Sequence, residues 1–426
     1  MQLSFTAMNV LAGSTLLGGL GGALGSFALL RRQSLLGDAL AHAALPGVCL
    51  AYLLTGSKAP FALLLGALAT GLLGSLAILG IVRFSRVKED AAMGIVLSVF
   101  FGLGIVLLTV IQKLPAGNQS GLDKFLFGQA ATLVREDLIT MAVLATAACL
   151  AIVLLFKEMK LLCFDPGFAA SLGLPVRRLE ILLTLLLVVV VVVGLQTVGV
   201  VLIVATLITP AAAARQWTDR LSSMVWLAAA IGALSGAFGS LASAQIDRLP
   251  TGPVIVLASS IALILSLVAA PGRGLAWQLL RERRAAARIR RENLLKDLYR
   301  LGEERDDWGE YLPRPLLMGM RGQSASQLAR SARPLVRAGW VESAGDALRL
   351  TDAGRREASQ VVRNHRLWEL YLKRRLELAA DHVHRDAEAM EHVLSPDLTD
   401  EIERLLDFPR IDPHGREIPA RAQGAA

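Results

Sequence analysis

The sequence is poor in the residues that build disulfide frameworks and cysteine-bound metal clusters. Only 3 of its 426 residues are cysteines. Cys49, Cys149 and Cys163 are isolated in or near apolar runs, so we expect them to be small core residues. The phosphate-loop motif G-x-x-x-x-G-K-S/T is absent, so the chain cannot hydrolyse ATP by that mechanism, and we expect neither an enzyme nor a bound nucleotide. Met1–Val10 lacks the basic leader of a cleavable signal peptide, so we expect none.

Long apolar stretches are what the sequence has in abundance. Hydrophobic residues make up 54% of the chain and the mean hydropathy is +0.52, which is high for a globular protein and ordinary for a membrane protein. A spanning helix needs about 20 mostly apolar residues. The candidate runs are 9–30, 36–55, 60–82, 91–112, 138–156, 179–194, 196–214, 222–245 and 252–270. Residues 275–426 are charged and contain most of the histidines.

This division predicts an all-α polytopic membrane protein with about nine transmembrane helices, followed by a small cytoplasmic α+β winged-helix and helical dimerisation domain. The expected segments are a membrane domain at 1–272, a basic linker helix at 273–290, a winged-helix-like domain at 291–360 and a helical domain at 361–426. Loops rich in Lys and Arg are cytoplasmic. Such residues fall on alternate loops, as Arg31/Arg32, Arg83/Arg86/Lys88, Lys157/Lys160 with Arg177/Arg178, and Arg215/Arg220. We therefore expect a multi-pass protein of the cell (inner) membrane with its C-terminal domain in the cytoplasm.

Asp38 and His42 are the ionisable residues of most interest in the apolar part. They are four residues apart in the second run and share one helical face. Charged groups at membrane depth are costly and usually face a bundle interior or an aqueous path. One interpretation is that they line a cation pathway. The other is that they lie near the cytoplasmic end and pair structurally with a neighbour.

Residues 164–178, FDPGFAASLGLPVRR, are too polar to span the membrane. Asp165 or the adjacent Pro-Gly can begin a short helix over Phe168–Leu172, and Gly173 to Pro175 would end it. A short cytoplasmic helix between two spans suits docking onto a partner. The alternative is an interfacial amphipathic turn.

The segments SLLGDALAHAALPGV, VKEDAAMGIVLSVFFGLGIVLL, FDPGFAASLGLP and VGVVLIVATLITPAAAARQW resemble the permease subunits of metal-ion ABC importers for manganese, zinc or iron. The likeness covers about residues 8–270. It implies a homodimeric permease that receives metal from an extracytoplasmic metal-binding protein and is driven by a separate cytoplasmic ATPase subunit. It also implies that Asp38 and His42 face the translocation pathway. The matching short helix docks on the ATPase in that family, which implies coupling roles for Asp165, Phe168, Ser171, Leu172, Gly173 and Pro175.

The charged part begins with a basic helix over 275–305, whose arginines either rest on anionic lipid headgroups or form a solvated linker face. Residues 311–357 have a winged-helix pattern: a helix over 323–338, two short strands around a turn at 344–346, and a further helix from 351. The histidines concentrate beyond it. His365 and Glu369 are four apart, and Glu388, Glu391 and His392 share one helical face. This donor set suits Mn, Fe, Co or Zn; ordinary charged helices are the alternative.

Residues 291–418 resemble the iron- and manganese-dependent repressors of the diphtheria toxin repressor type, through VVRNHRLWELYL, DAEAMEHVLSPDL and DPHGREIP. The resemblance implies a divalent transition metal (Mn, Fe or Zn) in this domain. The implied metal residues are His365, Glu369, His384, Glu388, Glu391 and His392. Glu388 follows the manganese pattern, because iron sensors have Cys there.

Two departures from the repressor pattern are visible. Asn293 and Lys296 stand where the first helix of the family supplies further ligands, and Lys296 would repel a metal ion, which argues against a complete site. Pro334 lies inside the expected recognition helix, where proline costs about 3 kcal/mol and kinks the helix. Arg330, Arg333 and Arg337 of that helix could still meet DNA phosphate.

Two functions follow from these patterns. The first is a metal-ion ABC permease whose cytoplasmic domain senses metal and adjusts transport. The second is a membrane-tethered, metal-dependent DNA-binding regulator, against which Pro334 and the departures at the first helix count. A third interpretation makes the C-terminal domain a degenerate dimerisation piece.

Overall fold

The computed structural model describes residues 5–57, 60–113, 135–197, 199–246, 249–375 and 396–420. His384, Glu388, Glu391 and His392 lie outside the described residues. The chain divides into two compact units, Met1–Gln278 and Leu279–Ala426, and each is described by itself.

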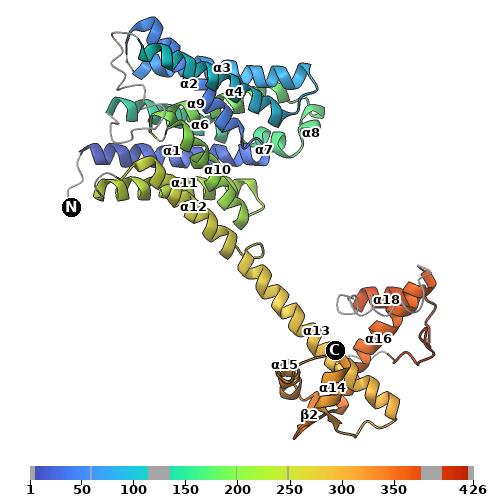
Figure 1. Ribbon diagram of the computed structural model, residues 1–426. Helices are drawn as coiled ribbons and strands as arrows, with labels where there is room; N and C mark the ends of the chain where they lie inside the picture. The colour runs from blue at the N-terminus through green and yellow to red at the C-terminus, as the bar shows by residue number, and fades with distance from the viewer. Residues whose placement is uncertain are drawn as a thin grey trace. The chain divides into compact units, whose positions relative to one another are not determined.

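The first unit is a bundle of helices (Figure 1). Its described helices are α1 (Phe5–Leu30), α2 (Leu36–Thr55), α3 (Pro60–Phe84), α4 (Glu89–Gln112), α6 (Arg135–Leu154), α7 (Phe156–Phe164), α8 (Pro166–Ser171), α9 (Val176–Thr197), α10 (Val200–Trp217), α11 (Leu221–Gln245) and α12 (Thr251–Ala269). Within the described residues, eight helices are long and apolar enough to cross a membrane: α1, α2, α3, α4, α6, α9, α11 and α12. The remaining predicted run, 196–214, corresponds to α10, whose 18 residues span roughly 27 Å at 1.5 Å per residue.

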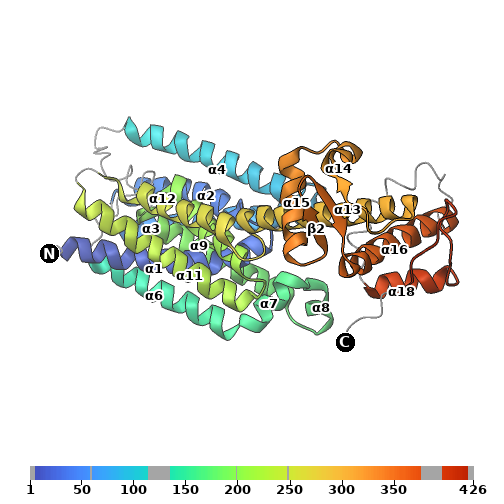
Figure 2. The same ribbon diagram turned by 90° about the horizontal axis from the view of Figure 1, so that it is seen from below.

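Glycines bring the backbones of α1 and α11 into direct contact, and the two helices run side by side in both views (Figures 1 and 2). A Cβ atom on Gly18 would lie 2.2 Å from the carbonyl oxygen of Gly232, and one on Gly22 would lie 2.2 Å from that of Ala228. Gly19, one residue away, has 3.6 Å of clearance. Small residues permit this close packing where lipid supplies no hydrophobic drive for helix association.

Burial differs strongly between helices. Most of α1 and α2 is buried, whereas α4, α6 and α12 expose most of their apolar side chains, as lipid-facing or subunit-facing helices do. The cysteines follow the same division. Cys49 is buried in α2 and Cys163 is half-buried, but Cys149 on α6 is exposed. The expectation of a core residue is therefore wrong for Cys149, because no described part of the chain covers its side chain.

The second unit continues from α13 (Leu275–Arg305), which begins within the first unit. Its further elements are β1 (Leu312–Pro313), α14 (Arg314–Arg321), α15 (Ala325–Arg337), β2 (Val341–Ala344), β3 (Ala347–Leu350), α16 (Asp352–Arg375) and α18 (Pro396–Leu405). The strands form an antiparallel sheet in the order β1-β3-β2. The predicted winged-helix elements are all present, with Gly345 at φ +56° turning the β2–β3 hairpin.

Two apolar clusters hold the second unit together. One joins α13 to α14, α15 and the sheet through Leu294, Leu298, Leu328, Leu335 and Leu348. The other joins α16 to α18 through Leu367, Leu370, Ile402 and Leu406.

Candidate functional site

The Asp38 and His42 side chains meet on one face of α2. His42 Nε2 lies 3.3 Å from Asp38 Oδ1, and the two side chains are 17% and 34% exposed. The edge of the imidazole meets the Phe101 ring of α4, with ring centroids 4.7 Å apart. His42 Nδ1 is buried and has no hydrogen-bond partner among the residues that the structure describes. If Nε2 carries the proton and donates it to the Asp38 carboxylate, Nδ1 presents a bare lone pair.

Close contacts of α3 and α4 fix this part of α2. A Cβ atom on Gly74 of α3 would lie 2.7 Å from the Ala43 side chain, and one on Gly104 of α4 would lie 2.8 Å from Leu45. These glycines let both helices pack directly against the turns that carry Asp38 and His42. Sequence reasoning missed Phe101, since a phenylalanine in an apolar run gives no sign of which neighbour it meets.

The structural alternative for Asp38 needs a basic partner other than His42. Arg31, at the adjoining helix end, instead binds Glu180 of α9, with Nη2 and Oε1 2.7 Å apart. The ion pair recorded for Asp38 within the described residues is the one with His42.

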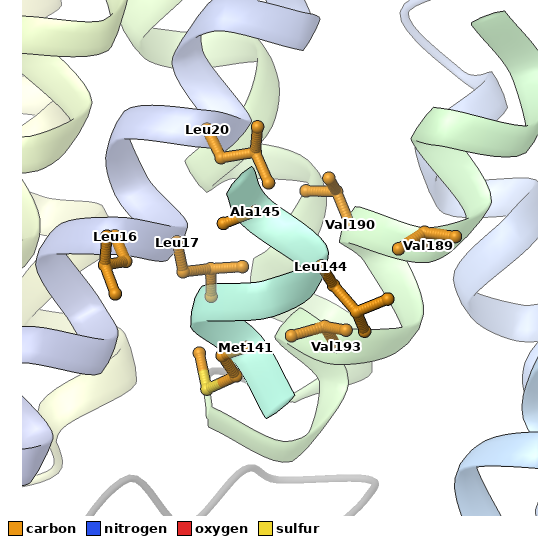
Figure 3. A pocket seen from close by; sticks show the side chains of 9 residues that line it. All are labelled: Leu16, Leu17, Leu20, Met141, Leu144, Ala145, Val189, Val190 and Val193. Carbon is orange, nitrogen blue, oxygen red and sulfur yellow. The ribbon is translucent and has the colours of Figure 1, made fainter. Parts of the chain in front are cut away.

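A small cavity lies elsewhere in the bundle, between α1, α6 and α9 (Figure 3). Its volume is about 10 Å³, roughly the space that one water molecule needs. The side chains that line it are all apolar: Leu16, Leu17, Leu20, Met141, Leu144, Ala145, Val189, Val190 and Val193. It offers no ligand for a metal ion.

The predicted short helix is present as α8. Asp165 caps it, since its Oδ1 accepts a hydrogen bond of 2.8 Å from the Phe168 backbone N–H, and Pro166 occupies the first turn. Ser171 bonds back to the Phe168 carbonyl at 2.8 Å. Gly173, at φ +79°, then redirects the chain towards Pro175 and α9.

The surface around α8 is unusually apolar. Phe164, Phe168 and Leu172 are 55%, 52% and 59% exposed. They are spaced four residues apart. Phe164, the last residue of α7, was not among the residues named from the sequence.

In the second unit, His365 and Glu369 lie on α16 with Nε2 and Oε1 3.1 Å apart, and their side chains are 6% and 2% exposed. A buried imidazole and carboxylate suit a borderline or hard metal ion. No group of three His, Cys, Asp or Glu side chains that could hold a metal is found among the described residues. The other expected ligands lie outside them.

The first-helix positions can be tested against a metal site. Among the described residues, Asn293 Oδ1 is buried and accepts no hydrogen bond, which makes it a neutral oxygen of the kind that hard cations accept. Lys296 lies one turn further along α13 and is 0% exposed. The oxygen of Asn293 therefore fits a divalent ion chemically, whereas a lysine side chain is no ligand for one.

The three arginines of α15 are exposed and spaced by three and four residues, so Arg330, Arg333 and Arg337 lie on one side of the helix. Ser324 and Gln327 form a capping box at its start. Pro334 lies inside α15, as the sequence indicated, and the helix continues to Arg337. The missing N–H of the proline removes one backbone bond to an earlier carbonyl.

Two protein families match this chain, one in its first unit and one in its second. The family described as "ABC 3 transport family" matches residues 4–270, and "Iron dependent repressor, metal binding and dimerisation domain" matches residues 351–420. The chain is 46% identical to the manganese transport system membrane protein MntC of Bacillus subtilis over 371 residues, 87% of this chain and 85% of the relative. It is 47% identical to the zinc transport system membrane protein TroC of Treponema pallidum over 66% of this chain and 95% of the relative.

A solved structure, PsaBC from Streptococcus pneumoniae in complex with Fab, contains a chain that superposes with a TM-score of 0.57 at 35% identity. The match covers 63% of this chain and 93% of that chain.

Proposed function

We infer that this chain, which belongs to the ABC 3 transport family, is the membrane-spanning subunit of an importer of divalent transition metal ions. It is a multi-pass membrane protein with a metal-dependent-repressor domain at its C-terminal end. Manganese is the proposed cargo, with zinc or iron as the other candidates, because the two relatives named above carry manganese and zinc transport in their names. Membership of an ABC transport family implies an ATPase and a substrate-binding protein as partners.

The observation that carries this proposal is the His42 imidazole with its bare, buried Nδ1. Metal-bound histidines usually donate their other ring N–H to a carboxylate, which orients the ring and raises its basicity. Asp38, 3.3 Å from Nε2, is in place for that role, and Phe101 limits rotation of the ring. We propose that a divalent ion in transit binds His42 Nδ1 while Asp38 holds the ring from Nε2.

Metal uptake by cells that express the chain with its ATPase and binding protein tests this assignment. His42→Ala removes the proposed ligand, and Asp38→Asn removes its orienting carboxylate. Loss of a supporting partner typically lowers metal affinity or activity 10- to 100-fold, so uptake should fall by at least about tenfold in both. Tyr52→Phe, a buried position on the same helix, is the matched control and should transport normally. Normal uptake by both test variants would contradict the proposal.

The exposed apolar residues of α8 are the proposed docking surface for the ATPase. Phe168 and Leu172 would insert into the partner, and the Asp165 cap would keep the helix formed. Phe168→Ser should uncouple ATP hydrolysis from transport while leaving the membrane bundle folded. The assay is metal-stimulated ATPase activity of the reconstituted complex. Leu54→Ser changes an exposed apolar residue near the end of α2 and serves as the control.

We further propose that the repressor-like domain senses cytoplasmic metal and adjusts transport, with the two copies of a homodimer pairing through it. Support comes from the buried His365–Glu369 pair and from the family match over 351–420. Calorimetry of the purified chain with Mn, Fe and Zn, with and without Glu391→Ala and His392→Ala, tests the site. Metal uptake by these variants should depend on the metal concentration differently from uptake by the unchanged chain. The same dependence in both would refute the regulatory role.

One observation supports a second function, binding to DNA. Arg330, Arg333 and Arg337 lie exposed on one side of the uninterrupted helix α15, the arrangement that phosphate contact requires. A gel shift of the detergent-solubilised chain with and without manganese would reveal it, and Arg333→Gln should weaken it.

A further inference from the structure

A polar pocket of about 400 Å³ opens where three helices of the first unit end. It lies at the turn from α10 to α11 and at the end of α12. We refer to it as the basic pocket. The residues that line it are Gln216, Trp217, Thr218, Asp219, Arg220, Ser223, Pro271 and Arg273. Nothing in the proposed transport mechanism uses it.

An ion-pair cluster builds one wall of the basic pocket. Arg273 donates to the Asp219 carboxylate and, at 3.1 Å, to the Arg215 carbonyl oxygen. Arg215 Nη1 lies 3.5 Å from the same carboxylate and 3.3 Å from the Thr218 carbonyl oxygen. Both arginines are therefore held in place by one acid.

The cluster carries excess positive charge. Counting Arg215, Arg220 and Arg273 against Asp219 gives three positive charges and one negative, a formal net charge of +2. Arg220 is exposed and forms no ion pair within the described part of the chain. Arginine binds phosphate oxygens through its planar fork of N–H donors. The local chemistry therefore suits a singly or doubly charged phosphate.

The position of the pocket identifies the source of that phosphate. The candidate span of α11 begins at Leu221, and that of α12 ends at Ala269, so the pocket lies at the end of both spans. Trp217 is 47% exposed and donates its indole N–H to Ser266 of α12 at 2.9 Å. Tryptophan anchored in this way is typical of the depth at which lipid headgroups lie.

We propose that the basic pocket binds the phosphodiester headgroup of an anionic phospholipid. The free guanidinium of Arg220 and the oriented one of Arg273 bind the phosphate oxygens, and Trp217 packs beside the glycerol backbone. The bound lipid joins the α10–α11 turn to the segment between α12 and α13. The stability of that segment consequently depends on the anionic lipid content of the membrane.

The test uses the purified full-length chain in a neutral detergent. Native mass spectrometry with phosphatidylglycerol and with phosphatidylcholine measures how much of each lipid stays bound. Arg220→Gln should weaken phosphatidylglycerol binding about fivefold, since one arginine near an anionic lipid surface contributes about 1 kcal/mol. Arg273→Gln should weaken it at least as much. Arg86→Gln, which changes an exposed arginine of the turn between α3 and α4, is the control and should leave binding unchanged.

Three results would overturn the proposal. Equal losses in Arg220→Gln and Arg86→Gln would show that the lipid is held by diffuse surface charge. Equal binding of phosphatidylcholine would show that the negative charge is not recognised. Displacement of the lipid by millimolar inorganic phosphate would identify a soluble anion as the ligand, provided that phosphate alone also protects Arg220 from an arginine-modifying reagent. Circular dichroism of each variant separates loss of binding from loss of fold.

Discussion

Arg366 is the buried charge on which the repressor-like domain should depend most. Its side chain is 3% exposed and joins α16 to two other parts of the second unit. It donates to both carboxylate oxygens of Glu303 on α13 and to the Glu417 carbonyl oxygen, and Nε lies 3.5 Å from the Asp412 carboxylate. Removal of Arg366 should therefore release the 410–419 segment from α16.

The magnitude follows from what the substitution leaves behind. Removing one partner of a buried ion pair typically costs 3–5 kcal/mol, because the other charge stays buried without compensation. Asp412 is 2% exposed but keeps two backbone donors, the N–H groups of His414 and Arg416 at 2.8 Å each. The cost of Arg366→Ala should therefore lie near the lower end, at about 3 kcal/mol, which is roughly a hundredfold in a local opening equilibrium.

Amide hydrogen exchange of the full-length chain, read by mass spectrometry, measures that equilibrium segment by segment. Exchange in 410–419 and in α16 should accelerate roughly a hundredfold in Arg366→Ala. Arg349→Ala is the matched control, because Arg349 pairs with Glu342 on the exposed hairpin, where solvent screens the charges. In Arg349→Ala, amide exchange in the β2–β3 hairpin and in the 410–419 segment should change little. Acceleration of less than about tenfold in Arg366→Ala, or equal acceleration in both variants, would refute the reasoning.

Three shorter predictions follow from packing and from ionisation. Gly18→Ala should lower the melting temperature and the yield of monodisperse protein in fluorescence size-exclusion, since its Cβ would overlap a carbonyl oxygen of α11 at 2.2 Å, whereas Gly19→Ala, with 3.6 Å of clearance, should behave as wild type; equal behaviour would contradict the close contact. Burial raises the pKa of the Cys163 thiol from 9.0 to about 11, so at pH 7 maleimide should label it roughly a hundredfold more slowly than a cysteine placed at exposed Ser171 in a background without other cysteines; comparable rates would contradict the burial. Burial, followed by the nearby Glu303 charge, raises the pKa of Tyr299 above 10.0. The contribution of Tyr299 to the stability of the second unit is therefore fully present below pH 10 and is lost as the pH rises through the raised pKa. Tyr299→Phe should reduce that loss in an alkaline unfolding titration.

The sequence predicted the membrane architecture well because bilayers impose a simple rule on composition. Runs of about 20 apolar residues correspond to helices in the structure, and the change to charged residues after Ala269 marks the last span. The same holds for the short helix near Asp165 and for the hairpin at Gly345, since capping and turn residues act locally.

Sequence patterns were a weaker guide where distant residues determine the environment. The sequence indicated a kink at Pro334, but only the structure shows that α15 continues beyond it to Arg337. Cys149 looked like a core residue by composition, although it is exposed on α6. Neither fact can be inferred from the residues adjacent in the sequence.

The sequence by itself determined the spans, the family and the identity of the charged residues placed among apolar ones. Only the tertiary structure decided that His42 meets Phe101, that Arg366 joins three segments, and that Arg220 and Arg273 line one pocket. The reason is physical. Local sequence sets backbone conformation and hydrophobic periodicity, whereas the partner of a polar side chain is set by helix packing between residues far apart in the chain.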